Sequence, residues 1–332
     1  MGVILAQRPD ARVTVRTTAP AWLFALSADP RVEVQAFAAD TGMVQVDSLR
    51  LDEEGTAREA ARFYADFGRR VAEEAAYLRQ LDATIVVGDI PPLAFAAAAR
   101  AGVPSVAVGN FTWDWIYAAY PAFERQAPGV LDTIRQAYAS ATLALRLPLH
   151  GGFEPMAGVT RDIPLIARRS VRHRHDVRDA LGLPDDRPAV LASFGGYGAD
   201  LPVAQLLRSD RFVLMAPAGD TPKGLRYADL VAASDVVVSK PGYGIISECI
   251  ANDTALLYTS RGRFIEYDVF VEGMPRMLRC RYLPQEDLFA GTWADAIDAV
   301  LAQPVPADRQ RIDGARVAAD AIVGVSAGAT TA

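Results

Sequence analysis

The sequence predicts an α/β protein that contains two doubly wound parallel sheets. Short apolar runs alternate with segments of helical spacing, and the alternation stops and then restarts after a stretch rich in glycine and proline. Alternating strands and helices are typical of a parallel sheet that helices cover on both faces. A chain of 332 residues, 51% of them hydrophobic, is long enough for two domains with separate cores.

The first half contains five expected strands and two expected helical regions. Because glycine and proline interrupt the pattern after these elements, we interpret 1–148 as an N-terminal domain and 149–165 as a linker. The expected strands are the apolar runs at 12–17, 32–37, 83–87, 103–108 and 141–146, and the expected helices lie at about 55–80 and 93–101.

The second half repeats the same alternation, which predicts a C-terminal domain at 166–315. The tail at 316–332 begins with helical spacing and ends in small residues, so its end is expected to fray. The expected strands are 188–194, 212–217, 235–239 and 254–259, with helices near 200–207, 226–233, 243–251 and 284–302.

Composition excludes several classes of protein. A formal net charge of −6 argues against a nucleic-acid or anionic membrane partner. Cys249 and Cys280 are interpreted as buried thiols of a reducing compartment, not as a disulfide framework. No apolar run approaches the roughly 18 residues that span a bilayer, and no basic leader follows Met1. We therefore expect a cytoplasmic protein with no transmembrane segment.

The segment SKPGYGIISE (239–248) joins an expected strand to an expected helix. Ligands of doubly wound sheets bind beyond the carboxyl ends of the strands, where glycines allow close approach and helix amides face an anion. Gly242 and Gly244 fit this pattern, and Glu248 is placed to accept hydrogen bonds from a ribose diol. The alternative is a tight turn followed by a solvated acid that the helix dipole favours.

A second glycine cluster, SFGGYGAD (193–200), also follows an apolar run and precedes an expected helix. Both loops are therefore expected to open on the same edge of the second sheet. Neither cluster is followed by the GK[ST] of a P-loop, so an ATPase of that class is not expected. A nicotinamide enzyme is not favoured either, because GYGIIS lacks the full GxGxxG pattern.

The segments at 103–120 and 188–267, which include DLVAASDVVVSKPGYGIISECIANDTALLYT, resemble GT-B glycosyltransferases. The resemblance is strongest to the peptidoglycan N-acetylglucosaminyltransferase group and to the glycosyltransferase-like half of L-arabinokinases. It implies the GT-B fold, two Rossmann-like domains facing a cleft, with the diphosphate of a nucleotide sugar held at the junction 239–248 and its ribose held by Glu248. The expected binding residues are Ser193, Gly195, Gly196, Ser239, Lys240, Gly242, Tyr243, Gly244, Ser247, Glu248, Arg261 and Glu266.

Two departures from the family pattern concern the acceptor and the donor sugar. Members of the family open with a strand and a GHGxGHxxR loop, whereas this sequence begins MGVILAQRPDARVTV. We expect that the opening strand and loop are missing because the gene start is placed too late. The alternatives are that the chain is a fragment or that the acceptor-side histidine of the family is dispensable here. After TALLYT the family often has an acid-Gln pair that contacts the sugar, and this chain has Arg261, Arg263, Glu266 and Tyr267 instead. The identity of the donor sugar therefore stays open.

The expected chemistry is displacement at an anomeric carbon by an acceptor hydroxyl, without a metal or a further cofactor. Lys240 or Arg261 would neutralise the leaving phosphates, unless each is an ordinary solvated cation. The general base is expected in the N-terminal domain, where Asp89 follows an expected strand and Asp114 lies in a loop that is expected to face the same cleft. Asp89 is equally suited to cap the next helix.

The sequence thus predicts a metal-independent glycosyltransferase that uses a nucleotide sugar, with uridine diphosphate as the expected carrier and an unidentified hydroxyl acceptor. The alternative is a catalytically silent GT-B module that binds a nucleotide sugar or a partner protein. An upstream in-frame extension that encodes the missing loop would favour the enzyme.

Overall fold

The computed structural model describes residues 1–332 apart from 21, 26–28, 48, 196–198, 216–223 and 331–332. Its contacts divide the chain into two compact units, each assembled from segments that are distant in the sequence. The first unit consists of Met1–Val44, Asp52–Pro164 and Asp313–Ala332, and the second of Gln45–Leu51 and Leu165–Ile312.

The strands of the first unit form two parallel sheets, where the sequence predicts one. The two-stranded sheet pairs β1 with β2, and the four-stranded sheet has the order β3-β4-β5-β6. The strand expected at 83–87 is shorter and begins later in the structure, where β3 spans Val86–Gly88. The bounds are β1 Val13–Thr17, β2 Val32–Ala36, β3 Val86–Gly88, β4 Ser105–Gly109, β5 Leu143–Arg146 and β6 Thr160–Asp162.

The small β1–β2 sheet is attached to its neighbours by Arg16. Its guanidinium lies 3.8 Å from the ring centroid of Phe37 and 4.1 Å from that of Tyr77, and it donates to Glu74 at 2.7 Å. Glu74 and Tyr77 both lie on α4 (Phe67–Gln80). A cation between two rings and a carboxylate anchors the small sheet to this helix.

Among the helices of the first unit, α5 packs against β3 and β4 of the four-stranded sheet and also contacts α4 and α8. The expected helix at 55–80 is two helices, and the side chain of Asp52 caps the first by accepting from the amide of Gly55 at 2.7 Å. The bounds are α1 Gly2–Gln7, α2 Trp22–Ala25, α3 Glu53–Ala65, α4 Phe67–Gln80, α5 Pro92–Ala101, α6 Trp113–Ala118, α7 Pro121–Gln126, α8 Val130–Ala139, η1 Glu154–Val159 and α16 Gly314–Thr330.

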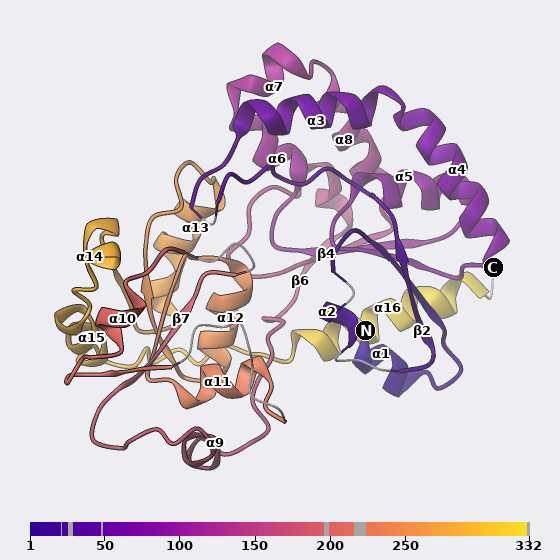
Figure 1. Cartoon of the computed structure of the whole chain (residues 1–332). Helices are drawn as coiled ribbons and strands as arrows, with labels where there is room; N and C mark the ends of the chain where they lie inside the picture. The colour runs from indigo at the N-terminus through magenta and orange to yellow at the C-terminus, as the bar shows by residue number, and fades with distance from the viewer. Residues whose placement is uncertain (21, 26–28, 48, 196–198, 216–223, 331–332) are drawn as a thin grey trace. The chain divides into compact units, whose positions relative to one another are not determined.

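Residues 149–165, expected as a linker, contain regular structure. The 3₁₀ helix η1 leads directly into β6, which pairs with β5. At the other end of the chain, α16 lies beside α1 (Figure 1), so the first unit contains both the first and the last helix.

The second unit contains one five-stranded parallel sheet with the order β11-β10-β9-β7-β8. Every residue of β9 and β10 is buried, as expected for central strands with helices on both faces. The bounds are β7 Ala189–Ser193, β8 Val213–Met215, β9 Val236–Ser239, β10 Ala255–Tyr258 and β11 Cys280–Tyr282.

The helices of the second unit include two that the sequence analysis merged. The expected helix at 284–302 is α14 and α15, because Gly291 ends α14 with a φ of 71° that favours glycine. The bounds are α9 Arg174–Ala180, α10 Val203–Leu206, α11 Tyr227–Ala233, α12 Tyr243–Ala251, α13 Glu266–Gly273, η2 Met274–Arg276, α14 Gln285–Ala290 and α15 Ala294–Leu301.

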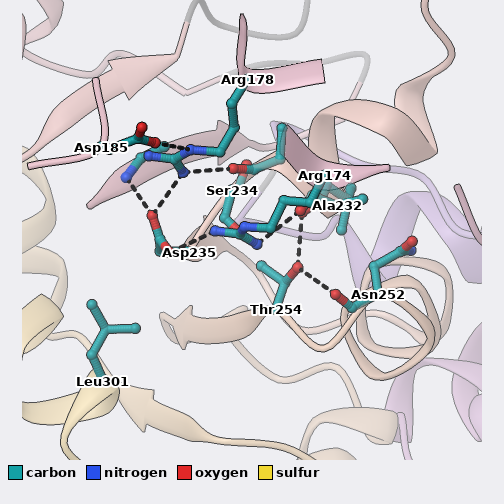
Figure 2. A network of polar contacts seen from close by, with 12 residues as sticks. Arg174, Arg178, Asp185, Ala232, Ser234, Asp235, Asn252, Thr254 and Leu301 are labelled. Atoms are coloured by element: carbon teal, nitrogen blue, oxygen red, sulfur yellow. Dashed lines mark hydrogen bonds and ion pairs between the residues drawn. The ribbon is translucent and has the colours of Figure 1, made fainter. Parts of the chain in front are cut away.

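Two arginines of α9 hold the start of β9 in place. Figure 2 shows Arg174 and Arg178 converging on the carboxylate of Asp235, at 2.5 and 3.1 Å. Arg174 also donates to the carbonyl oxygens of Ala232 and Ser234, both at 2.8 Å. The two guanidinium groups therefore satisfy carbonyls at the end of α11 and neutralise the acid that follows it.

We expect Asp235→Ala to lower the free energy of unfolding by about 1.5–3 kcal/mol, because it removes the shared acceptor of two arginines and of the Ala189 amide. Asp185→Ala is the matched control, since Asp185 lies 3.7 Å from Arg178 but its side chain is 86% exposed. That variant should change stability by less than about 0.5 kcal/mol. Denaturant titration measures both, and equal effects would contradict the central role of Asp235.

Candidate functional site

The two glycine loops of the second unit begin side by side. Ser193 ends β7 and Ser239 ends β9, and these two residues are partners in the strand register. The buried hydroxyl of Ser239 donates to the carbonyl oxygen of Ser193 at 2.5 Å. The hydroxyl of Ser193 lies 2.6 Å from that of Tyr227. These bonds fix the relative position of the two loop origins.

The junction between β9 and α12 contains glycines that the fold itself does not require. Gly242 has an extended φ of −158°, which any residue adopts, and Gly244 lies in the first turn of α12. A Cβ atom at either position would meet no other atom within 4 Å. The backbone at these two glycines is therefore not covered by other atoms on the side of the Cβ, and the first N–H groups of a helix have no partner within it.

In the loop that follows β7, glycine is favoured by the backbone conformation. Gly195 has a φ of 72°, a conformation that favours glycine on steric grounds. Gly196 lies outside the described residues.

Two other predicted binding residues make hydrogen bonds within the protein. The hydroxyl of Tyr243 accepts from the backbone amide of Ile166 at 3.2 Å. The buried hydroxyl of Ser247 donates to the carbonyl oxygen of Gly244 at 2.9 Å. Both interactions shape the start of α12.

Glu248 lies in the second turn of α12 and is only 3% exposed. Burial raises the pKa of its carboxyl group, and the charge of Arg168 opposes this shift. The Nε of Arg168 donates to Glu248 at 2.5 Å, while its guanidinium lies 5.6 Å from the ring centroid of Tyr227. Glu248 is therefore a buried, paired acid and not a solvated first-turn acid.

A cationic cluster follows β9 and β10. Burial, and then the charge of Arg261, lower the pKa of Lys240 to about 8, and Asp47 opposes this shift. Arg261 lies over the ring of Phe264, 3.9 Å from its centroid. The remaining predicted residue, Glu266, is buried in the first turn of α13.

Asp47 reaches the second unit from the first half of the chain. It belongs to the segment Gln45–Leu51, which the contacts place with the second unit. Its carboxylate accepts from the amides of Leu49 and Arg50 at 2.8 and 2.9 Å, which closes the segment into a tight loop. Sequence reasoning missed this contribution, because it comes from a region assigned to the other domain.

In the first unit, Asp89 is near Asp40. Asp89 follows β3 and keeps accessible surface, yet the surrounding protein desolvates its carboxyl and raises its pKa, and the charge of Asp40 raises it further. Asp40 accepts from the indole Nε1 of Trp113 at 3.0 Å, and burial raises its pKa as well. Sequence reasoning missed Asp40, because its partner Trp113 is 73 residues away in the sequence.

Asp114 has a different charged neighbour. Its side chain is 6% exposed, and its Oδ2 lies 3.5 Å from the Nε of Arg135 on α8. Its Oδ1 is buried and has no hydrogen-bond partner among the described residues. The two predicted catalytic acids therefore have different surroundings.

Metal ligands and membrane spans were also sought. Within the described ranges, no three His, Cys, Asp or Glu side chains gather as metal ligands do. No described helix is long and apolar enough to cross a bilayer.

Comparison with known proteins places this geometry in a fold. No protein-family model matches the sequence. L-arabinokinase of Arabidopsis thaliana is 30% identical over 324 residues, which cover 92% of this chain and 31% of that protein. The chain thus spans about a third of the length of this relative.

Three solved structures are similar over nearly the whole chain. MurG of Acinetobacter baumannii has a TM-score of 0.54 at 12% identity, covering 97% of this chain and 94% of its own. The kitacinnamycin glycosyltransferase has a TM-score of 0.57 at 14% identity, and the match covers 99% of this chain and 92% of that protein. UGT2 of Phytolacca americana has a TM-score of 0.54 at 15% identity, and the match covers 98% of this chain and 90% of that protein. The chain therefore has the GT-B fold, which confirms the predicted fold class.

We expect the Lys240 amine to titrate near pH 8, well below its ordinary 10.5, because burial disfavours its charged form. Lys240 and Lys223 are the two lysines of the chain, so Lys223→Arg leaves a single lysine to follow. The rate of acetic anhydride labelling against pH, read by mass spectrometry, gives the midpoint. A midpoint near 10.5 would contradict the burial, and Arg261→Ala should raise the midpoint.

The same shift has a consequence for stability. Between pH 8 and 10.5 the unfolded chain binds a proton at Lys240 that the folded chain has lost. The contribution of Lys240 to the free energy of unfolding therefore increases as the pH rises through this window. Lys240→Met should remove this increase.

Proposed function

We propose that the protein is a glycosyltransferase that moves a sugar from a uridine diphosphate sugar to a hydroxyl acceptor. The observation that carries the proposal is the β9–α12 junction, where open glycine backbone meets unpaired helix amides one turn before the buried Glu248. A diphosphate fits the amides and a ribose fits the carboxylate.

The surrounding charges suit a leaving nucleoside diphosphate. Lys240 follows directly on β9, and Arg261 is close enough to lower its pKa. Phosphate oxygens between these groups would stabilise the charged form of Lys240. When the bond from the anomeric carbon to the phosphate oxygen breaks, its electron pair goes to that oxygen, and the cations and helix amides neutralise the new charge.

The uridine base is an inference from similar proteins of the same fold. The structure of Phytolacca americana UGT2 contains UDP-2-fluoroglucose and pterostilbene, and that of Arabidopsis thaliana UGT89C1, with a TM-score of 0.52 at 13% identity, contains UDP-L-rhamnose. Both uridine diphosphate sugars contain a diphosphate and a ribose diol, which are the two groups that the β9–α12 junction suits.

The base that activates the acceptor is Asp89. A carboxylate with a raised pKa is a better proton acceptor than an ordinary aspartate, and the charge of Asp40 contributes to that rise. The acceptor oxygen attacks the anomeric carbon as its proton passes to Asp89.

One observation favours the alternative of a silent nucleotide-sugar-binding module. The strands of the first unit form two separate sheets, and not the single sheet that would support an acceptor site. Binding without transfer distinguishes the alternative from the enzyme.

We expect uridine diphosphate to bind the wild-type protein more tightly than its 2′-deoxy analogue, and Glu248→Ala to lose this preference. Hydrogen bonds to a charged group contribute about 1.5–3 kcal/mol, so the variant should bind the ribonucleotide at least about tenfold more weakly. Calorimetric titration measures both ligands. The matched control is Glu272→Ala, because the side chain of Glu272 is 82% exposed on α13 of the same unit.

Gly244→Ala separates binding from folding. The added methyl meets no protein atom within 4 Å and lies in a helix, so stability should be unchanged or rise by up to about 1 kcal/mol while nucleotide affinity falls. Equal binding of ribo and deoxy ligands by wild-type and Glu248→Ala protein, or equal stabilisation by inorganic phosphate, would overturn the nucleotide site.

We expect Asp89→Asn to slow the release of uridine diphosphate from a UDP-sugar by about 10²–10⁴-fold without changing nucleotide affinity, because it removes the base. The assay screens UDP-glucose, UDP-N-acetylglucosamine and UDP-arabinose, with water and simple alcohols as acceptors. Asp40→Asn should lower the pKa of Asp89 and move the acidic limb of the rate profile to lower pH. Nucleotide binding with no release from any donor would favour the silent module.

A further inference from the structure

A pocket on the first unit is lined by residues to which the proposed transfer assigns no role. It has a volume of about 610 Å³ and is lined by side chains of α6, α8 and η1. The side chains that the following argument uses are Asp114, Trp115, Arg135, Gln136, Glu154 and Pro155. We propose that this pocket binds a saccharide, independently of the nucleotide site.

The indole of Trp115 is held in place by two glycines. A Cβ atom at Gly151 would lie 2.2 Å from Cζ2 and 2.4 Å from Cε2 of that ring, so the ring rests directly on the glycine backbone. Gly152 has a φ of 82°, and its Cβ would lie 2.1 Å from the Oγ1 of Thr112. Only glycine fits these two positions, which fixes one side of the indole before any ligand arrives.

The backbone around these glycines is tied to the loop before α6. The amide of Gly151 donates to the carbonyl oxygen of Asn110 at 2.9 Å, and the amide of Phe153 approaches the Oγ1 of Thr112 at 3.4 Å. The glycines therefore belong to a rigid seat for Trp115 and do not act as a flexible connection.

Asp114, which lines the pocket, has a carboxylate oxygen without a hydrogen-bond donor among the described residues. The Oδ1 of Asp114 is buried without a partner among the described residues, although a buried polar atom without a hydrogen bond is costly. The nearby guanidinium of Arg135 lies 3.5 Å from the other oxygen, too far for a good hydrogen bond. A ligand hydroxyl that donates to this oxygen, after a rotation of the Asp114 side chain toward the pocket, would remove this cost.

Charge and shape select the ligand class. Two carboxylates, Asp114 and Glu154, disfavour an anion, while Arg135 next to Asp114 disfavours a cation. A neutral ligand rich in hydroxyls can donate to the carboxylates and accept from Gln136 and Arg135. Trp115 and Pro155 add apolar surface for the flat face of a ring. Pyranose sugars combine these properties.

Saturation-transfer difference NMR with cellobiose, maltose and lactose tests the proposal. We expect transfer to at least one of them in the wild-type protein, and at least a fivefold loss of affinity in Asp114→Asn and in Gly151→Ala. Gly158→Ala is the matched control, because a Cβ there meets no other atom within 4 Å and Gly158 does not line the pocket. It should bind the disaccharide as the wild type does.

Each variant is checked for folding by the rise in its melting temperature with uridine diphosphate, or with inorganic phosphate if no nucleotide binds. If Gly151→Ala does not fold, Asp114→Asn still tests the proposal. The saccharide should still bind when uridine diphosphate is present. The proposal is overturned if no disaccharide binds, if Asp114→Asn binds it equally, or if uridine diphosphate displaces it. Binding of butylammonium in place of the sugars would also overturn it.

Discussion

The carboxylate of Asp235 fixes the edge of the second sheet on which the candidate site depends. It accepts from Arg174, Arg178 and the amide of Ala189, while the Asp235 amide donates back to Ala189. The starts of β7 and β9 are therefore locked together. Because both strands are short and parallel, the same register places Ser193 beside Ser239 at their ends. An ionic network at the start of the two strands thus sets the relative position of Ser193 and Ser239, where the glycine loops begin.

The sequence predicted those parts of the fold and site that local pattern determines. The strand, glycine and helix order around 239–248 is local, so its position could be predicted from residues alone. The partners Arg168 and Asp40 could not, since each is more than 70 residues from the group that it contacts. The separation of β1 and β2 from the larger sheet was also missed, because strand pairing is a property of the whole unit.

Glycine serves different physical purposes at positions that look alike in the sequence. Gly195 adopts a left-handed conformation, Gly151 makes room for an indole, and Gly242 and Gly244 need neither conformation nor space within the protein. A Cβ atom at Gly195 would also meet no atom within 4 Å, so the φ angle, and not space, separates it from Gly242 and Gly244. Motif searches cannot separate these cases, whereas the backbone φ together with the space around each Cβ position does.

The division of the chain into interleaved segments limits how such proteins can recombine. Leu49 packs against the core of the second unit although it is encoded within the first half, and the last helix belongs to the first unit. A chimera with one crossover near residue 164 would combine Leu49 of one parent with the core of another. Faithful exchange of a donor half between relatives therefore requires several crossovers, and evolution by simple fusion of halves would carry a packing mismatch at each of these contacts.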